Sequence, residues 1–382
     1  MTRPGSTAAA SPAAAGTRVT GAGEPLVEIR GLCVDYGSGP AAVHAVTGAD
    51  LVLRRGAVMG LAGESGSGKS TLAYAAVRLL RSPGMITGGQ VLYHPRHGET
   101  VDLLEIGEHA LRSMRWSQIA VVLQSAMNAL NPVLSIGAQL TDVLAAHEPT
   151  MTAAARTGRA AELLTMVGIS ADRLKSYPHE LSGGMRQRVM IAMALALRPE
   201  IVIFDEPTTA LDVVTQREIL EELTALREQF GFAVLFITHD LSLLIEIANS
   251  IAVMYAGRLV EAADAQALFR APRHPYTLGL LNSFPSLHGA QERRTGIPGS
   301  PPDLRQLPPG CVFHPRCPYV TARCRTDAPP LRSPGPAGRR LAACWLQETP
   351  GQAPGELARP EPGAGPAAAA GLPARPAGEA GE

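Results

Sequence analysis

The stretch from Gly63 to Ser70, Gly-Glu-Ser-Gly-Ser-Gly-Lys-Ser, contains the residue types that bind phosphate groups. Its glycines let the backbone fold closely around phosphate oxygens, with amide N–H groups pointing inward at the positive end of a following helix. Lys69 is expected to reach the β- and γ-phosphates, and Ser70 to offer its hydroxyl to Mg²⁺. The expected phosphate-binding residues are Gly63, Glu64, Ser65, Gly66, Ser67, Gly68, Lys69, Ser70 and Thr71.

The residues around this loop predict the elements that must position it. The apolar run 57–62 has the character of a buried strand, and apolar residues recur at helical spacing after Ser70. A strand, a glycine loop and a helix in this order are the structural context that a phosphate site requires. The lysine itself is informative, because Lys69 and Lys175 are the only lysines in the sequence.

Polar residues follow three further apolar strands of the sequence. Asp205 and Glu206 end the strand 201–204, where Asp205 is expected to hold the Mg²⁺ shell and Glu206 to polarise the attacking water. Gln124 follows the strand 119–123, either as a loop residue bonded to backbone or as a ligand of Mg²⁺ and water. His239 follows the strand 233–237, as an ordinary polar residue or as a group facing the phosphates. These positions share the ligand-binding edge of a parallel sheet.

A second candidate anion site is the Ser-Gly-Gly step at Ser182, Gly183 and Gly184, which opens an apolar helix. Taken alone this step is a common helix start. Between the strand 119–123 and this step the pattern is helical and rich in Ala, which predicts a small helical subdomain over about 127–178. Tyr36, at the end of a strand segment, either packs or stacks on a purine base.

Composition limits the classes of function. Lys plus Arg and Asp plus Glu both number 34, so no overall charge favours nucleic acid or an anionic membrane as partner. The start of the chain lacks the apolar core of a signal peptide, and the charge-free residues 117–141 include polar side chains that a bilayer would penalise. We therefore expect no membrane-spanning helix. Residues 1–24 and 348–382, rich in Ala, Pro and Gly, are expected to be disordered.

Together these motifs resemble an ATP-binding cassette (ABC) ATPase over about residues 26–263. Walker A lies at 63–70, the glutamine loop at Gln124, the signature Leu-Ser-Gly-Gly-Met at 181–185, Walker B at 201–206, and the switch histidine at His239. Met185 stands where many cassettes have Gln. The resemblance implies an α/β fold, a P-loop NTPase cassette with a RecA-like parallel sheet core, an antiparallel β subdomain and an inserted helical subdomain.

The resemblance also implies how the site works. Two cassettes would pair head to tail and enclose ATP between Walker A of one and the signature of the other. Ser182, Gly183, Gly184 and Asp212 would then meet the nucleotide of the partner, while Tyr36 would stack on adenine. Mg²⁺ would be held through Ser70, Gln124 and Asp205, and the catalytic residues would be Glu206, His239 and Gln124.

Beyond the cassette, the chain resembles the ATP-binding subunits of oligopeptide and dipeptide importers, a family that includes nickel importers. The residues that carry this are His-Pro-Tyr-Thr at 274–277, Pro-Gly-Ser-Pro-Pro-Asp-Leu at 298–304 and Gly-Cys-Val-Phe-His-Pro-Arg-Cys-Pro at 310–318. The predicted division is a cassette over 25–265 and a Cys/Pro-rich extension over 266–347.

Membership of such a family implies a peripheral subunit at the cytoplasmic face of the membrane. Its partners would be a second ABC subunit, expected to be a paralogue, two permeases and, indirectly, an extracytoplasmic solute-binding protein, with no nucleic acid. The expected substrate is a dipeptide or oligopeptide. Nickel or another small solute is the alternative, and a soluble ABC ATPase without a transport role is a more remote one.

Four of the five cysteines lie in the predicted extension, at Cys311, Cys317, Cys324 and Cys344. A reducing cytoplasm disfavours disulfides, and the usual zinc-ligand spacing of two to four residues is absent. An iron–sulfur cluster tolerates wider spacing, and Pro318 after Cys317 is typical of ferredoxin-type sites. Zinc or simple reduced thiols remain alternatives, while the family resemblance implies a [4Fe–4S] cluster.

Overall fold

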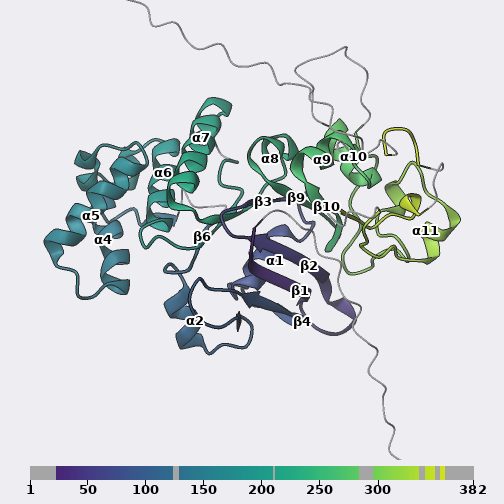
Figure 1. The fold of residues 1–382 in the computed structure, drawn as a ribbon, viewed down its shortest axis with the longest axis horizontal. Coiled ribbons are helices and arrows are strands. Elements are labelled where there is room, and N and C mark those ends of the chain that lie inside the picture. Colours follow the sequence, from purple (N-terminus) through teal and green to yellow (C-terminus); the bar gives the residue numbers. More distant parts are fainter. Residues whose placement is uncertain are drawn as a thin grey trace, which may run out of the picture.

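The computed structural model describes residues 23–123, 129–209, 211–283, 296–334, 340–348 and 353–357. Within them two β-sheets form the framework (Figure 1). The smaller sheet is antiparallel, with strand order β2-β1-β4-β5. Its strands are β1 (Pro25–Tyr36), β2 (Val43–Arg54), β4 (Gly84–Tyr93) and β5 (Val101–Asp102).

The larger sheet has the order β11-β10-β9-β3-β8-β7-β6. Neighbouring strands from β9 to β6 are parallel, so their carboxyl ends meet at one edge. Every residue of β3, β7 and β8 is buried, as is typical of strands covered on both faces. The strands are β3 (Val58–Ala62), β6 (Ile119–Val122), β7 (Ile201–Asp205), β8 (Ala233–Ile237), β9 (Ser250–Tyr255), β10 (Arg258–Asp264) and β11 (Leu341–Ala342).

Helices cover both faces of the larger sheet, and alternate residues of its strands belong to two different cores. On β7, Ile201 and Ile203 pack with α1 and the smaller sheet, whereas Val202 and Phe204 pack with α6, α7 and α8. The helices are α1 (Lys69–Ala76), α2 (Glu108–Met114), α4 (Ile136–His147), α5 (Ala153–Met166), α6 (Gly183–Ala194), α7 (Val213–Phe230), α8 (Leu241–Ile247), α9 (Ala265–Arg270), α10 (Pro275–Asn282) and α11 (Ala322–Thr326). Short 3-10 turns are η1 (Gly39–Ala41), η2 (Ala171–Lys175), η3 (Pro178–Glu180), η4 (His314–Arg316) and η5 (Trp345–Gln347).

The inserted helices form one end of the molecule, where α4 and α5 lie beside α6 (Figure 1). Side chains at both N-caps favour helix formation there, because Ser135 accepts from the Ala138 amide and Thr152 from the Ala155 amide. These helices fall between β6 and β7 in the chain. The predicted parallel core, antiparallel β part and helical insertion are thus confirmed, although the expected start of the helical part near residue 127 lies outside the described residues.

The segment after β10 forms the opposite end (Figure 1). Its strand β11 continues the larger sheet, with Ala342 paired to Glu261 of β10, and Phe313 packs into the core of the cassette. The segment is therefore joined to the cassette by a strand pair and by apolar contact. No helix among the described residues is long and apolar enough to cross a bilayer.

Candidate nucleotide site

The phosphate loop connects β3 to α1 at the carboxyl edge of the larger sheet. Gly63 and Gly68 have φ values of +146° and +101°, a region that disfavours residues with a Cβ. A Cβ on Gly63 would lie 2.2 Å from the carbonyl oxygen of Met254, and one on Gly68 would lie 2.3 Å from that of Ala45. Both glycines are therefore required by sterics as well as by conformation.

Lys69 lies across the loop with its ammonium group paired. Its Nζ donates to the carbonyl oxygens of Gly63 at 2.8 Å and Glu64 at 2.9 Å, and to Ser67 Oγ at 3.3 Å. Burial lowers the pKa of Lys69, while the carboxylates of Glu206, Asp205 and Glu64 oppose that shift. The lysine is thus a buried cation within a ring of acceptors, which a phosphate group is suited to replace.

The next two turns of α1 join the loop to Walker B. Ser70 Oγ donates to Asp205 Oδ1 at 2.8 Å, and Tyr74 OH donates to Asp205 Oδ2 at 2.5 Å. Burial and the bond to Asp205 raise the pKa of Tyr74, which keeps it a donor. A hydroxyl and a carboxylate side by side are the oxygen ligands that Mg²⁺ prefers, so the pair Ser70 and Asp205 fits this ion.

Glu206 and His239 meet at the same edge. Glu206 is a non-glycine residue with φ +46°, and its amide donates to Ile237 O at 2.9 Å. Its carboxylate accepts from Thr209 Oγ1 at 3.0 Å and lies 3.5 Å from His239 Nδ1. A strained backbone that aims a carboxylate at a ligand edge is typical of a functional position.

Tyr36 is also close to the loop. The Tyr36 hydroxyl and Thr71 Oγ1 are 3.3 Å apart, so the end of β1 adjoins the first turn of α1. Gln124, by contrast, lies outside the described residues. Its predicted role stays a prediction.

The signature residues lie elsewhere in this chain. Ser182 caps α6 by accepting from the Met185 amide, and a Cβ on Gly184 would meet Thr215 of α7 at 2.6 Å. Asp212 caps α7 by accepting hydrogen bonds from the backbone amide and the hydroxyl of Thr215. Both hydrogen bonds lower the pKa of Asp212, and the one from the amide lowers it more. Among the described residues, no hydrogen bond or ion pair joins residues 182–184 to the phosphate loop.

The four cysteines of the extension come together although 33 positions separate the first from the last. All four line one small cavity, with His274 and Phe313 among its other walls. Burial raises the pKa of Cys317 to about 11 and that of Cys344 to about 12, and it also raises the pKa of Cys311. None of the five cysteines, all of which are described, forms a disulfide.

Two family models match this chain. The model "ABC transporter" matches residues 46–209, and the model "Oligopeptide/dipeptide transporter, C-terminal region" matches residues 260–324. A putative peptide import ATP-binding protein of Brucella melitensis is 45% identical over 319 residues, covering 81% of this chain and 94% of its own. The chain belongs to the ATP-binding subunits of the oligopeptide/dipeptide ABC transporter family.

Other members of this family and a solved cassette agree. The oligopeptide transport ATP-binding protein OppD of Escherichia coli is 43% identical, and the match covers 84% of this chain and 93% of OppD. The dipeptide transport ATP-binding protein DppD of Escherichia coli is 42% identical, and the match covers 80% of this chain and 92% of DppD. A dimeric ATP-binding cassette bound to ADP and phosphate after hydrolysis superposes with a TM-score of 0.55 at 28% identity, covering 63% of this chain and 99% of that one. ABC membership makes this chain an ATP hydrolase that uses ATP and Mg²⁺.

Sequence reasoning missed three residues that contact the nucleotide edge of this ABC cassette. Tyr74 holds Asp205, and Arg316 and Tyr276 hold Glu64. Tyr74 had a signal, because it lies four residues after Ser70 and thus one helical turn further on the same face. Tyr276 and Arg316 lie in the motifs 274–277 and 310–318 that carry the resemblance to the importer family, but more than 200 positions separate them from the loop, so the sequence did not indicate that they contact it.

Proposed function

We propose that this protein binds Mg–ATP at the phosphate loop and hydrolyses it to drive uptake of dipeptides or oligopeptides. The observation that carries the proposal is the junction of Lys69, Ser70, Asp205, Glu206 and His239 at one sheet edge, in a chain whose C-terminal region is of the peptide-importer type. The domain division follows from it: a cassette at 25–265, an extension at 266–347, and terminal segments 1–24 and 348–382.

Each residue at the edge takes one role. Lys69 and the loop amides bind the β- and γ-phosphates, and Thr71 supports the α-phosphate. Tyr36 stacks on the adenine ring. Ser70 and Asp205, already 2.8 Å apart, would hold Mg²⁺ together with Gln124. When bound, the ion would supply positive charge that stabilises the phosphate oxygens. These residues would orient the phosphate chain for attack by water.

Glu206 is the general base in this proposal. Its carboxylate accepts the proton of the attacking water, and His239, 3.5 Å from that carboxylate, hydrogen-bonds the γ-phosphate. Phosphoryl transfer to water needs positioning and charge stabilisation more than covalent chemistry. The edge supplies both with one base, one metal site and several donors.

The second half of each site comes from another chain. Ser182 is the N-cap of α6, and Gly183 and Gly184 form its first turn, so the three residues lie at a helix N-terminus, where backbone amides bind anions. Among the described residues no hydrogen bond or ion pair joins them to the loop of their own chain, and the solved cassette that this chain resembles is dimeric. We assign them, with Asp212, to the nucleotide of a second ABC subunit. We propose a paralogue as that subunit, with two permeases and a solute-binding protein completing an importer at the cytoplasmic face of the membrane.

We also propose that Cys311, Cys317, Cys324 and Cys344 hold a [4Fe–4S] cluster. The four thiols line one cavity, so the donor set is present. Among the described residues, no group of three or more His, Cys, Asp or Glu side chains is arranged so that it could hold a metal ion. The proposal therefore rests on the four thiols at one cavity and on the family resemblance, and in a [4Fe–4S] cluster each cysteine would bind a different iron. Iron and acid-labile sulfide analysis of anaerobically purified protein tests this assignment.

Transport is tested in cells that lack this subunit. The wild-type chain should restore uptake of a labelled tripeptide, and Glu206→Gln should not, since hydrolysis drives transport. Nickel uptake is measured in parallel. If the wild-type chain restores uptake of nickel and not of peptide, the assigned substrate class is wrong.

A further inference from the structure

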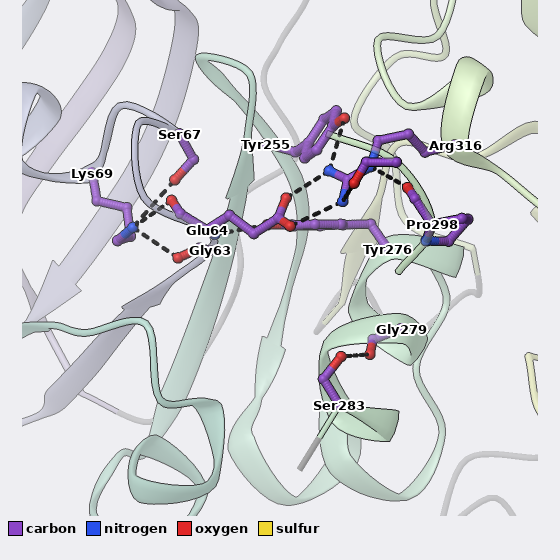
Figure 2. A network of polar contacts seen from close by, with 11 residues as sticks. Gly63, Glu64, Ser67, Lys69, Tyr255, Tyr276, Gly279, Ser283, Pro298 and Arg316 are labelled. Carbon is purple, nitrogen blue, oxygen red and sulfur yellow. Dashed lines mark hydrogen bonds and ion pairs between the residues drawn. The ribbon is translucent and has the colours of Figure 1, made fainter. Parts of the chain in front are cut away.

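The phosphate loop is held from outside the cassette. The guanidinium of Arg316 makes two parallel hydrogen bonds to the Glu64 carboxylate, Nη1 to Oε2 at 2.7 Å and Nη2 to Oε1 at 3.0 Å (Figure 2). Glu64 is the second residue of the loop, and Arg316 lies 252 positions later in η4 of the extension. A two-bonded Arg–carboxylate pair fixes orientation as well as distance.

The backbone of Glu64 is held at the same point. Its amide donates to the hydroxyl of Tyr276 in α10 at 2.8 Å, and its carbonyl oxygen accepts from Lys69 Nζ at 2.9 Å (Figure 2). One residue therefore joins the extension, through Arg316 and Tyr276, to the lysine that binds phosphate. Displacement of Glu64 would move a direct partner of Lys69.

Arg316 is itself rigidly placed, unlike a surface cation. Its side chain is 5% exposed, and it also donates to the carbonyl oxygens of Pro298 at 2.7 Å and Gly299 at 3.3 Å. Its Nη1 lies 3.3 Å from the hydroxyl of Tyr255. The Glu64 side chain is 27% exposed, so the buried partner is Arg316, whose charge would lose its carboxylate if the pair opened.

Aromatic packing fixes the turn that carries Arg316. Phe313, in the same turn, packs on Tyr255 and Tyr276 with ring centroids 5.2 and 5.4 Å away, and the two tyrosines are 4.6 Å apart. Tyr255 ends β9 of the cassette, so this cluster bridges the cassette and the extension. We call the contacts of Arg316 and Tyr276 with Glu64 the clamp. Cys317 follows Arg316 directly, so one wall of the cysteine cavity lies beside the clamp.

From these contacts we infer that Arg316 and Tyr276 are positioning residues that order the phosphate loop before ATP binds. The extension thus acts on the nucleotide site of its own chain, through Glu64, in addition to any role of its cysteines. The inference rests on the proposed function, because it assigns a ligand to the loop. It predicts that loosening the clamp weakens ATP binding more than it slows turnover of bound ATP.

The test measures the loop without nucleotide and then with it. Hydrogen exchange of amides 64–71 is compared among wild type, Arg316→Met, Tyr276→Phe and Arg305→Met. Arg305 is a matched control, since it pairs with Asp303 on the exposed surface of the same extension. Arg316→Met should speed loop exchange by about tenfold or more, Tyr276→Phe by less, and Arg305→Met not at all.

Kinetics separate positioning from general damage. The KM for ATP should rise about tenfold in Arg316→Met and less in Tyr276→Phe, with kcat changed little. Tyr276→Phe removes a single oxygen atom, so it keeps the test valid if Arg316→Met does not fold. Wild-type exchange and wild-type KM in folded Tyr276→Phe and Arg316→Met would overturn the inference and leave the proposed function standing. A wild-type protein that binds no ATP would overturn both.

Discussion

The phosphate loop and the cysteine cavity lie in one chain, but their reactive groups are held in opposite ways. Lys69 is a charged group with three acceptors around it, so the loop is organised for a phosphate without any ligand. The thiols of Cys317 and Cys344 are kept neutral by burial, which raises their pKa to about 11 and about 12. A metal ligand must be a thiolate, so the cavity would need its metal to stabilise the charged form.

This difference shows which region can act alone. The loop needs no ligand for its own hydrogen bonds and can therefore bind and release ATP in each cycle. Cys324 Sγ already lies 3.2 Å from Thr321 Oγ1, so what the cavity would gain from a metal is stabilisation of the thiolate form of Cys317 and Cys344. The contact between Arg316 and Glu64 links the phosphate loop to the turn that adjoins the cysteine cavity.

The largest expected effect is that of Glu206→Gln, which should alter the nucleotide site without altering the cysteine cavity. Loss of the general base should slow ATP hydrolysis by about 10²- to 10⁴-fold, because the amide cannot accept the proton of water. ATP binding and the iron content should stay at wild-type values. Steady-state hydrolysis and equilibrium binding with the second ABC subunit present check this. Unchanged turnover would show that another group is the base.

Cys344→Ser should have the opposite effect, altering the cysteine cavity while largely preserving the nucleotide site. Iron and acid-labile sulfide should fall to background, since a hydroxyl is a poor replacement for a thiolate on iron. ATP binding should weaken only slightly, by less than in Arg316→Met. Cys33→Ser is the matched control, because Cys33 lies on β1 and does not line the cavity. Full iron content in purified Cys344→Ser would remove this residue from the proposed ligand set.

A smaller effect concerns the pH dependence of stability in the extension. Burial lowers the pKa of His274 to about 3, and its Nδ1 accepts from the Tyr276 amide as the N-cap of α10. An unfolded histidine titrates near 6.5, so below that pH the unfolded chain binds a proton that the folded chain excludes. Stability should fall as pH drops from about 6.5 toward 3, by about 2 kcal/mol at pH 5.

His274→Asn isolates this contribution, because Asn can cap the helix without titrating. Urea unfolding at pH 7 and pH 5 should show a smaller loss for the variant than for wild type. Equal losses in both proteins would mean that His274 does not supply the pH dependence.

The cassette could be predicted from sequence because its signals are local. The phosphate loop is one continuous motif, and the strands before Gln124, Asp205 and His239 are short apolar runs that end in polar residues. The structure confirms those strands as β6, β7 and β8. Strand β2, with Gly48 and His44 among its apolar residues, was not predicted, and neither were β9 and β10.

Contacts between the cassette and the extension could not be predicted. Arg316 and Glu64 are 252 positions apart, and nothing in the residues around either one indicates the other. The cysteines show the same problem. Their spacing in the sequence argued against the usual zinc patterns, but it could not show that the four thiols line one cavity. Both features depend on how β11, α10 and η4 pack on the finished sheet.

Every role assigned to the nucleotide edge depends on binding of Mg–ATP by Lys69 and its loop. Isothermal titration of the purified chain with Mg–ATP should therefore compare wild type with Lys69→Ala. We predict one saturable site per wild-type chain and its loss in a folded Lys69→Ala variant. Equal binding by the two proteins would show that the nucleotide binds elsewhere.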